Sequence, residues 1–237
     1  MTASSVLNKL FGSDTSFAVT DREQRSIMER APWNTRLFGE EQIRSLVQQL
    51  FLRGGPRSPR QVVFSCVDES SDVTDICQQV GRSLSAEIAG SVCIVEVAAQ
   101  RRCDESSFQI PISHIEGLDC LRDSALCLSK NLWLMPWDVF LRNQKALSAG
   151  WVRSRLDELR LAFDYTIFQA PPVGQFSDAL LLGHLCDGVV VILTAGSTRR
   201  VAARKVKERL YSANTRLLGT VLSGRTFPIP EKIYKRL

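Results

Sequence analysis

A polar loop between residues 66 and 74 holds most of the side chains that could do chemistry. It lies between a short apolar run, QVVFS (61–65), and an amphipathic segment that begins at Val73. Six of its side chains carry a carboxylate or a hydroxyl: Asp68, Glu69, Ser70, Ser71, Asp72 and Thr74. Carboxylates at the start of a helix satisfy its unpaired N–H groups and the positive end of its dipole. A solvated acidic turn is the alternative interpretation.

The segments around this loop alternate between apolar runs and amphipathic stretches. The apolar runs predict buried strands at residues 61–65, 92–97, 131–135, 164–168, 188–194 and 216–222. Helical periodicity predicts helices at residues 40–52, 73–89, 144–162, 177–184 and 199–213. Near-continuous apolar strands that alternate with helices are typical of a mostly parallel sheet covered on both faces. We therefore expect a doubly wound α/β fold.

This fold places the candidate site at one edge of the sheet. Ligands of parallel sheets bind beyond the carboxyl ends of the strands. The loops expected there are residues 66–72, 98–102, 169–175 and 195–198. For the domain organisation, we expect an N-terminal arm (1–35), one α/β domain (36–225) and a C-terminal tail (226–237), because a chain of 237 residues supports one sizeable core.

Residues 163–200, FDYTIFQAPPVGQFSDALLLGHLCDGVVVILTAGSTRR, resemble the bacterial tyrosine autokinases of capsule and exopolysaccharide synthesis. NLWLMP (131–136) and GEEQIRSLVQQLF (39–51) match other landmarks of that family, so the resemblance covers roughly residues 39 to 225. The family belongs to the deviant P-loop group, with the cell-division and plasmid-partition ATPases. The resemblance implies a P-loop NTPase-like fold.

The phosphate-binding loop of such proteins has a defined chemistry. Glycines let backbone N–H groups point at the phosphates, a lysine bridges them, and a Ser or Thr hydroxyl holds Mg²⁺. The equivalent stretch, residues 65–74, contains no glycine, Val73 stands at the lysine position, and Thr74 remains as a hydroxyl ligand. The carboxylates of the loop would repel a triphosphate. We expect a vestigial nucleotide loop without a cofactor, and ATP with Mg²⁺ only if activity persists.

The aspartates of the family's second and third motifs are also replaced in this chain. Glu96 stands at the first aspartate position of the second motif, and Ala98 stands at the second. Gln169 replaces the aspartate of the third motif, and a neutral amide is a poor partner for a Mg²⁺-bound water. The combined losses indicate a pseudoenzyme, with Glu96 and Gln169 as vestigial catalytic positions and no metal site.

The helix at residues 41–47, EQIRSLV, resembles the oligomerisation signature of the family, a Glu and two arginines at helical spacing. Glu41 and Arg44 match this signature, and Val47 replaces the second arginine. The resemblance leaves a homo-oligomer open. The alternative is a surface i,i+3 pair that contributes only a few tenths of a kcal/mol.

The C-terminal segment FPIPEKIYKRL (227–237) contains a single tyrosine, Tyr234, whereas family members carry a tyrosine-rich tail. Tyr234 is a candidate phosphosite. The segment is also a candidate docking element with Ile229, Ile233 and Leu237 as anchors, and we favour docking.

Composition limits the metal sites, the cellular location and the charged partners that we expect. Seven cysteines without a CxxC pair and only two histidines indicate reduced thiols and no structural zinc. We find no signal peptide or membrane span, and expect a cytoplasmic protein that reaches the inner membrane through a partner. The net charge of +5 is mild. The basic helix at residues 199–213 is a solvated face or a contact for anionic lipid or DNA.

Three functions follow from these observations. The leading hypothesis is a regulatory or scaffolding partner in exopolysaccharide synthesis that docks on a membrane chain-length regulator or an active kinase homologue. The second is a tyrosine kinase or ATPase that uses Thr74, Glu96 and Asp178. The third is a partition-type localisation protein that binds DNA or membrane, although we do not expect a nucleic-acid partner.

Overall fold

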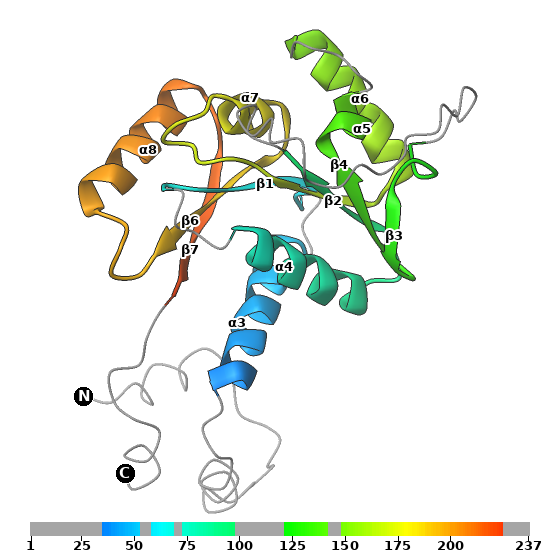
Figure 1. The fold of residues 1–237 in the computed structure, drawn as a ribbon, viewed down its shortest axis with the longest axis horizontal. Helices are drawn as coiled ribbons and strands as arrows, with labels where there is room; N and C mark the ends of the chain where they lie inside the picture. The colour runs from blue at the N-terminus through cyan, green and yellow to red at the C-terminus, as the bar shows by residue number, and fades with distance from the viewer. Residues whose placement is uncertain (1–34, 53–57, 69–72, 98–120, 142–147, 225–237) are drawn as a thin grey trace, which may run out of the picture. The chain divides into compact units, whose positions relative to one another are not determined.

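The computed structural model describes residues 35–52, 58–68, 73–97, 121–141 and 148–224 (Figure 1). The chain divides into a unit at residues 36–228 and a second unit formed by residues 1–35 and 229–237. Apart from Thr35, every described residue belongs to the first unit. The expected arm (1–35, except Thr35) and the expected tail (226–237) lie outside the described residues, so both stay predictions.

A seven-stranded sheet forms the centre of the described unit, in the order β3-β4-β2-β5-β1-β6-β7. Its strands are β1 (Gln61–Cys66), β2 (Val92–Glu96), β3 (Leu126–Ser129), β4 (Leu132–Pro136), β5 (Tyr165–Gln169), β6 (Gly188–Thr194) and β7 (Leu217–Ser223). All neighbouring strands pair in parallel except β3, which pairs antiparallel with β4 at one edge. The prediction of a mostly parallel sheet is confirmed.

Helices cover both faces of this sheet (Figure 1). They are α3 (Thr35–Leu50), α4 (Val73–Glu87), α5 (Trp137–Leu141), α6 (Ala149–Ala162), α7 (Asp178–Leu185) and α8 (Arg200–Ser212). One hydrophobic cluster contains residues of α3 and α4, and the other contains residues of α5, α6, α7 and α8. Because successive side chains of a strand point to opposite faces, strands β1 and β2, whose residues are all buried except the half-buried Glu96, supply both clusters.

The structure corrects several predicted elements. Strand β3 and helix α5 had no counterpart in the sequence prediction: all four residues of β3 are exposed, and α5 spans only five residues, so neither has a readable hydrophobic period. Strand β4 includes Pro136, which was expected to end it. Helix α6 begins at Ala149, where Ser148 accepts a hydrogen bond from the Trp151 N–H, and residues 144–147 lie outside the described residues.

Candidate functional site

The carboxyl edge of the parallel strands brings the predicted motif residues together. Glu96 at the end of β2 is in register with Gln169 at the end of β5, and Gln169 is in register with Phe64 of β1. The sheet hydrogen bonding continues past the strand ends: the Val97 N–H donates to the Gln169 carbonyl at 2.9 Å, and the Ala170 N–H donates to the Phe64 carbonyl at 2.8 Å. The backbone beneath the site is therefore firmly held.

The side chain of Gln169 bonds directly to the first turn of α4. Its Nε2 donates to the Thr74 Oγ1 at 2.7 Å. Its Oε1 is buried and has no hydrogen-bond partner within the described residues. The amide thus engages the one hydroxyl that the sequence offered as a Mg²⁺ ligand.

Val73, at the position of the family lysine, contributes to the hydrophobic core. Its side chain is only 8% exposed and lies in the same cluster as Ile76 and Cys77. The half-buried Asp68 follows β1, while Glu69, Ser70, Ser71 and Asp72 lie outside the described residues. The predicted capping of the helix by the carboxylates of Glu69 and Asp72 therefore stays a prediction.

The turn after β5 is locked onto the end of β1. The buried Ser65 Oγ donates to the Pro171 carbonyl at 2.6 Å and accepts from the Val173 N–H at 3.1 Å. A Cβ atom on Gly174 would lie 2.8 Å from the Val67 carbonyl oxygen, so the close approach requires glycine. Sequence reasoning missed Ser65, whose only signal was a hydroxyl in an otherwise apolar strand.

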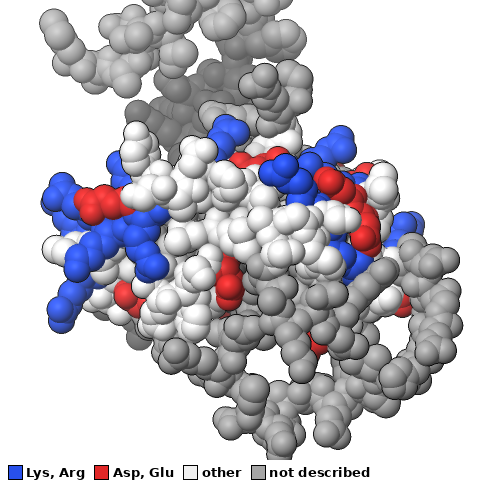
Figure 2. All heavy atoms as spheres, turned by 90° about the horizontal axis from the view of Figure 1, so that it is seen from above, with Lys and Arg blue, Asp and Glu red and all other residues white. Residues whose placement is uncertain are grey.

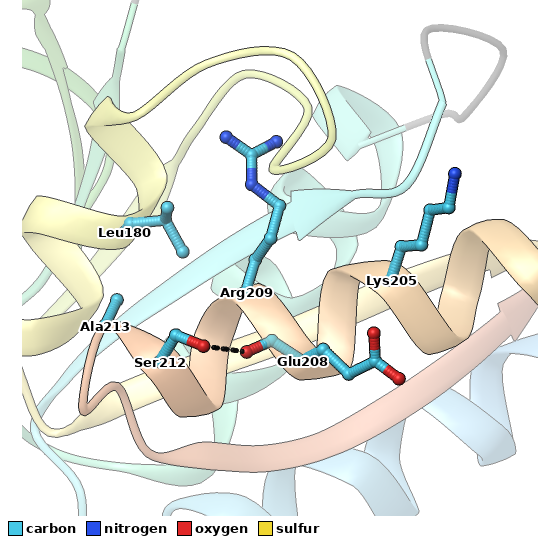
Figure 3. Close-up of a pocket in the computed structure, with 6 residues that line it drawn as sticks. All are labelled: Leu180, Lys205, Glu208, Arg209, Ser212 and Ala213. Atoms are coloured by element: carbon cyan, nitrogen blue, oxygen red, sulfur yellow. Dashed lines mark hydrogen bonds between the residues drawn. The ribbon is translucent and has the colours of Figure 1, made fainter.

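Helix α8 holds the same turn from the other side. Lysines and arginines gather on α8 (left in Figure 2), where the sequence predicted a solvated face or a contact for anionic lipid or DNA. Arg209 corrects this in part, because its Nη1 donates to the carbonyls of Val173 (2.9 Å) and Gly174 (2.5 Å). Arg209 and Lys205 rise on the same side of α8 beside a hollow of about 530 Å³ that Leu180 also lines (Figure 3).

The surroundings of the strand ends favour the neutral thiol of a cysteine over its thiolate. Burial, followed by the nearby Glu96 carboxylate, raises the pKa of Cys77. Burial also raises the pKa of the Asp178 carboxyl at the start of α7. Within the described residues, no three His, Cys, Asp or Glu side chains come together as a metal site.

The predicted oligomerisation residues are on α3, and one of them has a partner inside the chain. Arg44 Nε lies 3.1 Å from Glu87 Oε1 of α4. Val47 is fully buried in the core, and Glu41 is exposed. The candidate phosphosite Tyr234 lies outside the described residues, whereas Tyr211 on α8 is 88% exposed.

Sequence comparison relates the chain to bacterial tyrosine kinases over part of its length. Tyrosine-protein kinase YwqD of Bacillus subtilis (strain 168) is 35% identical over 79 residues, which are 33% of this chain and 33% of that protein. Tyrosine-protein kinase CpsD of Streptococcus agalactiae (serotype III, strain NEM316) is 29% identical over 77 residues, 32% of this chain and 33% of CpsD. The match spans a third of the length of these relatives. No protein-family model matches the chain.

Solved structures share the fold over most of the chain. The chimerical protein CapA2B2 aligns with a TM-score of 0.60 at 17% identity, over 79% of this chain and 85% of its own. The kinase domain of the Escherichia coli tyrosine kinase ETK aligns at 0.56 and 17%, over 81% and 79%. MinD in the MinC:MinD complex of Aquifex aeolicus aligns at 0.53 and 13%, over 69% and 68%. At these identities the likeness shows the fold alone, and the predicted P-loop NTPase-like class is confirmed.

Proposed function

Taking its homology to bacterial tyrosine-protein kinases as the premise, we propose that this chain is a non-catalytic regulatory or scaffolding protein of capsule or exopolysaccharide synthesis. It keeps the strand–loop–helix scaffold of a P-loop kinase from β1 to α4. The chemistry that binds and cleaves ATP at that scaffold has been replaced. The protein therefore acts by binding other proteins.

The contact between Gln169 and Thr74 is the observation that carries this proposal. A kinase of this group uses the Ser or Thr hydroxyl and an aspartate near this point to hold Mg²⁺ and its water. Here an uncharged amide takes the place of the carboxylate and hydrogen-bonds to the hydroxyl at 2.7 Å. An amide and a hydroxyl supply no negative charge to attract a divalent cation.

The position of Val73 adds to this argument. A lysine that bridges phosphates must reach out of the loop, whereas the Val73 side chain packs into the core with Ile76 and Cys77. The loop before it holds three carboxylates, Asp68, Glu69 and Asp72, which disfavour a polyphosphate. These residues do not fit Mg²⁺-ATP, and we assign no reaction step to it.

Calorimetric titration of Mg²⁺-ATP tests the absence of a nucleotide site. We expect no binding heat from this chain, while the Bacillus subtilis relative YwqD, measured under the same conditions, serves as the positive control. The double variant Val73→Lys, Gln169→Asp should still fail to bind, because the loop has no glycine to present its N–H groups. A micromolar Kd for the unmodified chain would overturn the proposal.

The partners in this proposal are a membrane chain-length regulator or an active kinase homologue, with peripheral localisation at the inner membrane through that partner. None of the described helices is long and apolar enough to cross a bilayer. Self-association through α3 is a further part of the proposal, because the side chain of Arg44 keeps 59% exposure despite its pairing with Glu87. Light scattering tests it: Glu41→Ala with Arg44→Ala should lower the mass of any oligomer.

The second hypothesis, a residual tyrosine kinase or ATPase, predicts that the chain binds and cleaves Mg²⁺-ATP. It requires Mg²⁺-ATP turnover that Glu96→Ala abolishes. The half-buried Glu96 at the carboxyl edge supports this reading, because its carboxylate ends β2 in register with Gln169. If the purified chain shows no turnover, with or without a membrane partner, this hypothesis is excluded.

A further inference from the structure

Helix α8 presents two rows of cations to the solvent. Arg200, Arg204 and Lys207 are exposed, and their spacing of four and three residues places them on one side of the helix. Lys205 and Arg209 follow a second row, four residues apart. The opposite side of the helix is occupied, because its apolar residues are buried in the core.

This concentration of charge is local to α8. Residues 199–212 contain six lysines and arginines and a single acid, Glu208. Helix α6, of similar length, contains three arginines against two acids, and its Arg160 lies 3.9 Å from Asp157. Figure 2 shows the same contrast: blue side chains gather at the α8 end, whereas blue and red alternate at the other end. The excess is therefore a property of this helix, beyond the net charge of +5.

Two exposed apolar side chains lie among the cations. Tyr211 is 88% exposed and continues the row of Arg200, Arg204 and Lys207, since it follows Lys207 by four residues. Val201 is 67% exposed. A tyrosine ring and a valine gain free energy where headgroups meet acyl chains, and tyrosine is enriched at that boundary. Val201 gains nothing from the phosphate backbone of a nucleic acid, which is bound mainly through charge.

We propose that the exposed face of α8 binds the surface of an anionic phospholipid membrane. Its cations pair with lipid phosphates, while Tyr211 and Val201 enter the headgroup layer. Because the apolar face of α8 is used inside the fold, the helix lies on the membrane without inserting deeply. This contact goes beyond the function proposed above, since it needs no protein partner and does not depend on whether ATP binds.

Vesicle sedimentation with the purified full chain tests the proposal. We expect binding to phosphatidylcholine vesicles in which phosphatidylglycerol is roughly one third of the lipid, and none to pure phosphatidylcholine. The triple variant Arg200→Gln, Arg204→Gln, Lys207→Gln should lower the partition coefficient by about 100-fold. Arg209 is left intact because it holds the turn at Val173 and Gly174.

A matched control removes the same charge elsewhere. Arg82 on α4, Lys130 between β3 and β4, and Arg153 on α6 are exposed, and changing all three to Gln also lowers the net charge by three. We expect this control to bind within about 3-fold of the unmodified chain. Equal loss in both triple variants would show a net-charge effect and overturn the proposal, and so would equal binding to uncharged vesicles. Unchanged thermal unfolding of both variants confirms that they fold.

A gain of binding gives an independent test. Glu208→Gln removes the single acid of the helix and should raise the partition coefficient about 5-fold. Higher salt should release the protein, because exposed charges are screened. Retention of a DNA duplex through Arg200, Arg204 and Lys207, without vesicle binding, would assign the face to nucleic acid and overturn the membrane proposal.

Discussion

The parallel strands start at one edge of the sheet, the amino edge, and end at the other, the carboxyl edge. The two edges differ in whether carboxylates join neighbouring strands. At the amino edge, the Asp187 Oδ2 accepts from the Arg60 N–H at 2.7 Å and the Gln61 N–H at 2.8 Å. The Asp164 Oδ2 there accepts from the N–H (2.7 Å) and the hydroxyl (2.9 Å) of Ser91. Each carboxylate ties the start of one strand to the start of its neighbour. Its negative charge is satisfied within the protein.

At the carboxyl edge, where α/β proteins bind ligands, uncharged side chains make the corresponding hydrogen bonds. Gln169 bonds to Thr74, and Ser65 bonds to the turn that contains Pro171 and Val173. A carboxylate at the position of Gln169 would need a cation or several N–H groups to offset its charge. Under the non-catalytic role proposed above, these uncharged contacts hold the carboxyl edge together without a ligand.

Removing Asp187 should have the largest effect on stability. Asp187→Ala leaves the backbone N–H groups of Arg60 and Gln61 without their acceptor, and we expect a loss of about 3 kcal/mol in the free energy of unfolding. Urea denaturation measures it. Asp187→Asn, which keeps one acceptor oxygen, should lose about half as much. A loss below about 0.5 kcal/mol for the alanine variant would show that the amino edge does not depend on this carboxylate.

Ser65→Ala should cost about 2 kcal/mol by the same measurement. The Ser65 side chain is fully buried and bonds to both the Pro171 carbonyl and the Val173 N–H. Its removal takes the donor from the Pro171 carbonyl, while the Val173 N–H keeps its bond to the Cys66 carbonyl at 3.0 Å. Ser65→Thr, which keeps the hydroxyl but adds a methyl group to a packed site, separates hydrogen bonding from packing. A neutral Ser65→Ala would mean that the backbone bonds to β1 and the Arg209 side chain hold the turn without the hydroxyl.

The bond between Gln169 and Thr74 should contribute least, because Thr74 is exposed. A double-mutant cycle with Gln169→Ala and Thr74→Val should give a coupling of about 0.5 kcal/mol. Zero coupling would mean that the two side chains do not interact in solution. Addition of Mg²⁺ should leave the coupling unchanged, and a Mg²⁺-dependent value would restore the metal site to consideration.

The pH dependence of stability tests the contribution of Asp164 at the amino edge. The Ser91 backbone N–H, followed by its hydroxyl, lowers the pKa of Asp164. A carboxyl with a lowered pKa in the folded state stabilises the protein above its unfolded pKa, about 3.9, and this contribution is lost as the pH falls through the folded pKa. Asp164→Asn should therefore flatten the loss of stability below about pH 4. An unchanged acid limb would contradict the assignment.

The order of strands and helices could be predicted from the sequence because burial imposes a pattern. Strands covered on both faces are largely apolar, as in QVVFSC of β1 and GVVVILT of β6, and those runs stand out. The exposed strand β3 is free of that constraint, so LCLS carried no signal. The positions of Glu96 and Gln169 at the carboxyl edge followed from the same alternation.

The sequence by itself determined the fold class and the absence of glycine and lysine from the loop at residues 65–74, since both depend on residue types along the chain. Tertiary structure alone decided the contacts around that loop. Gln169 meets Thr74 across 95 positions of sequence, because the parallel register of β5 and β1 sets where both lie. Packing likewise distinguishes Arg209, which binds carbonyls, from the other cations of α8, because a residue's type does not reveal what a distant segment places beside it.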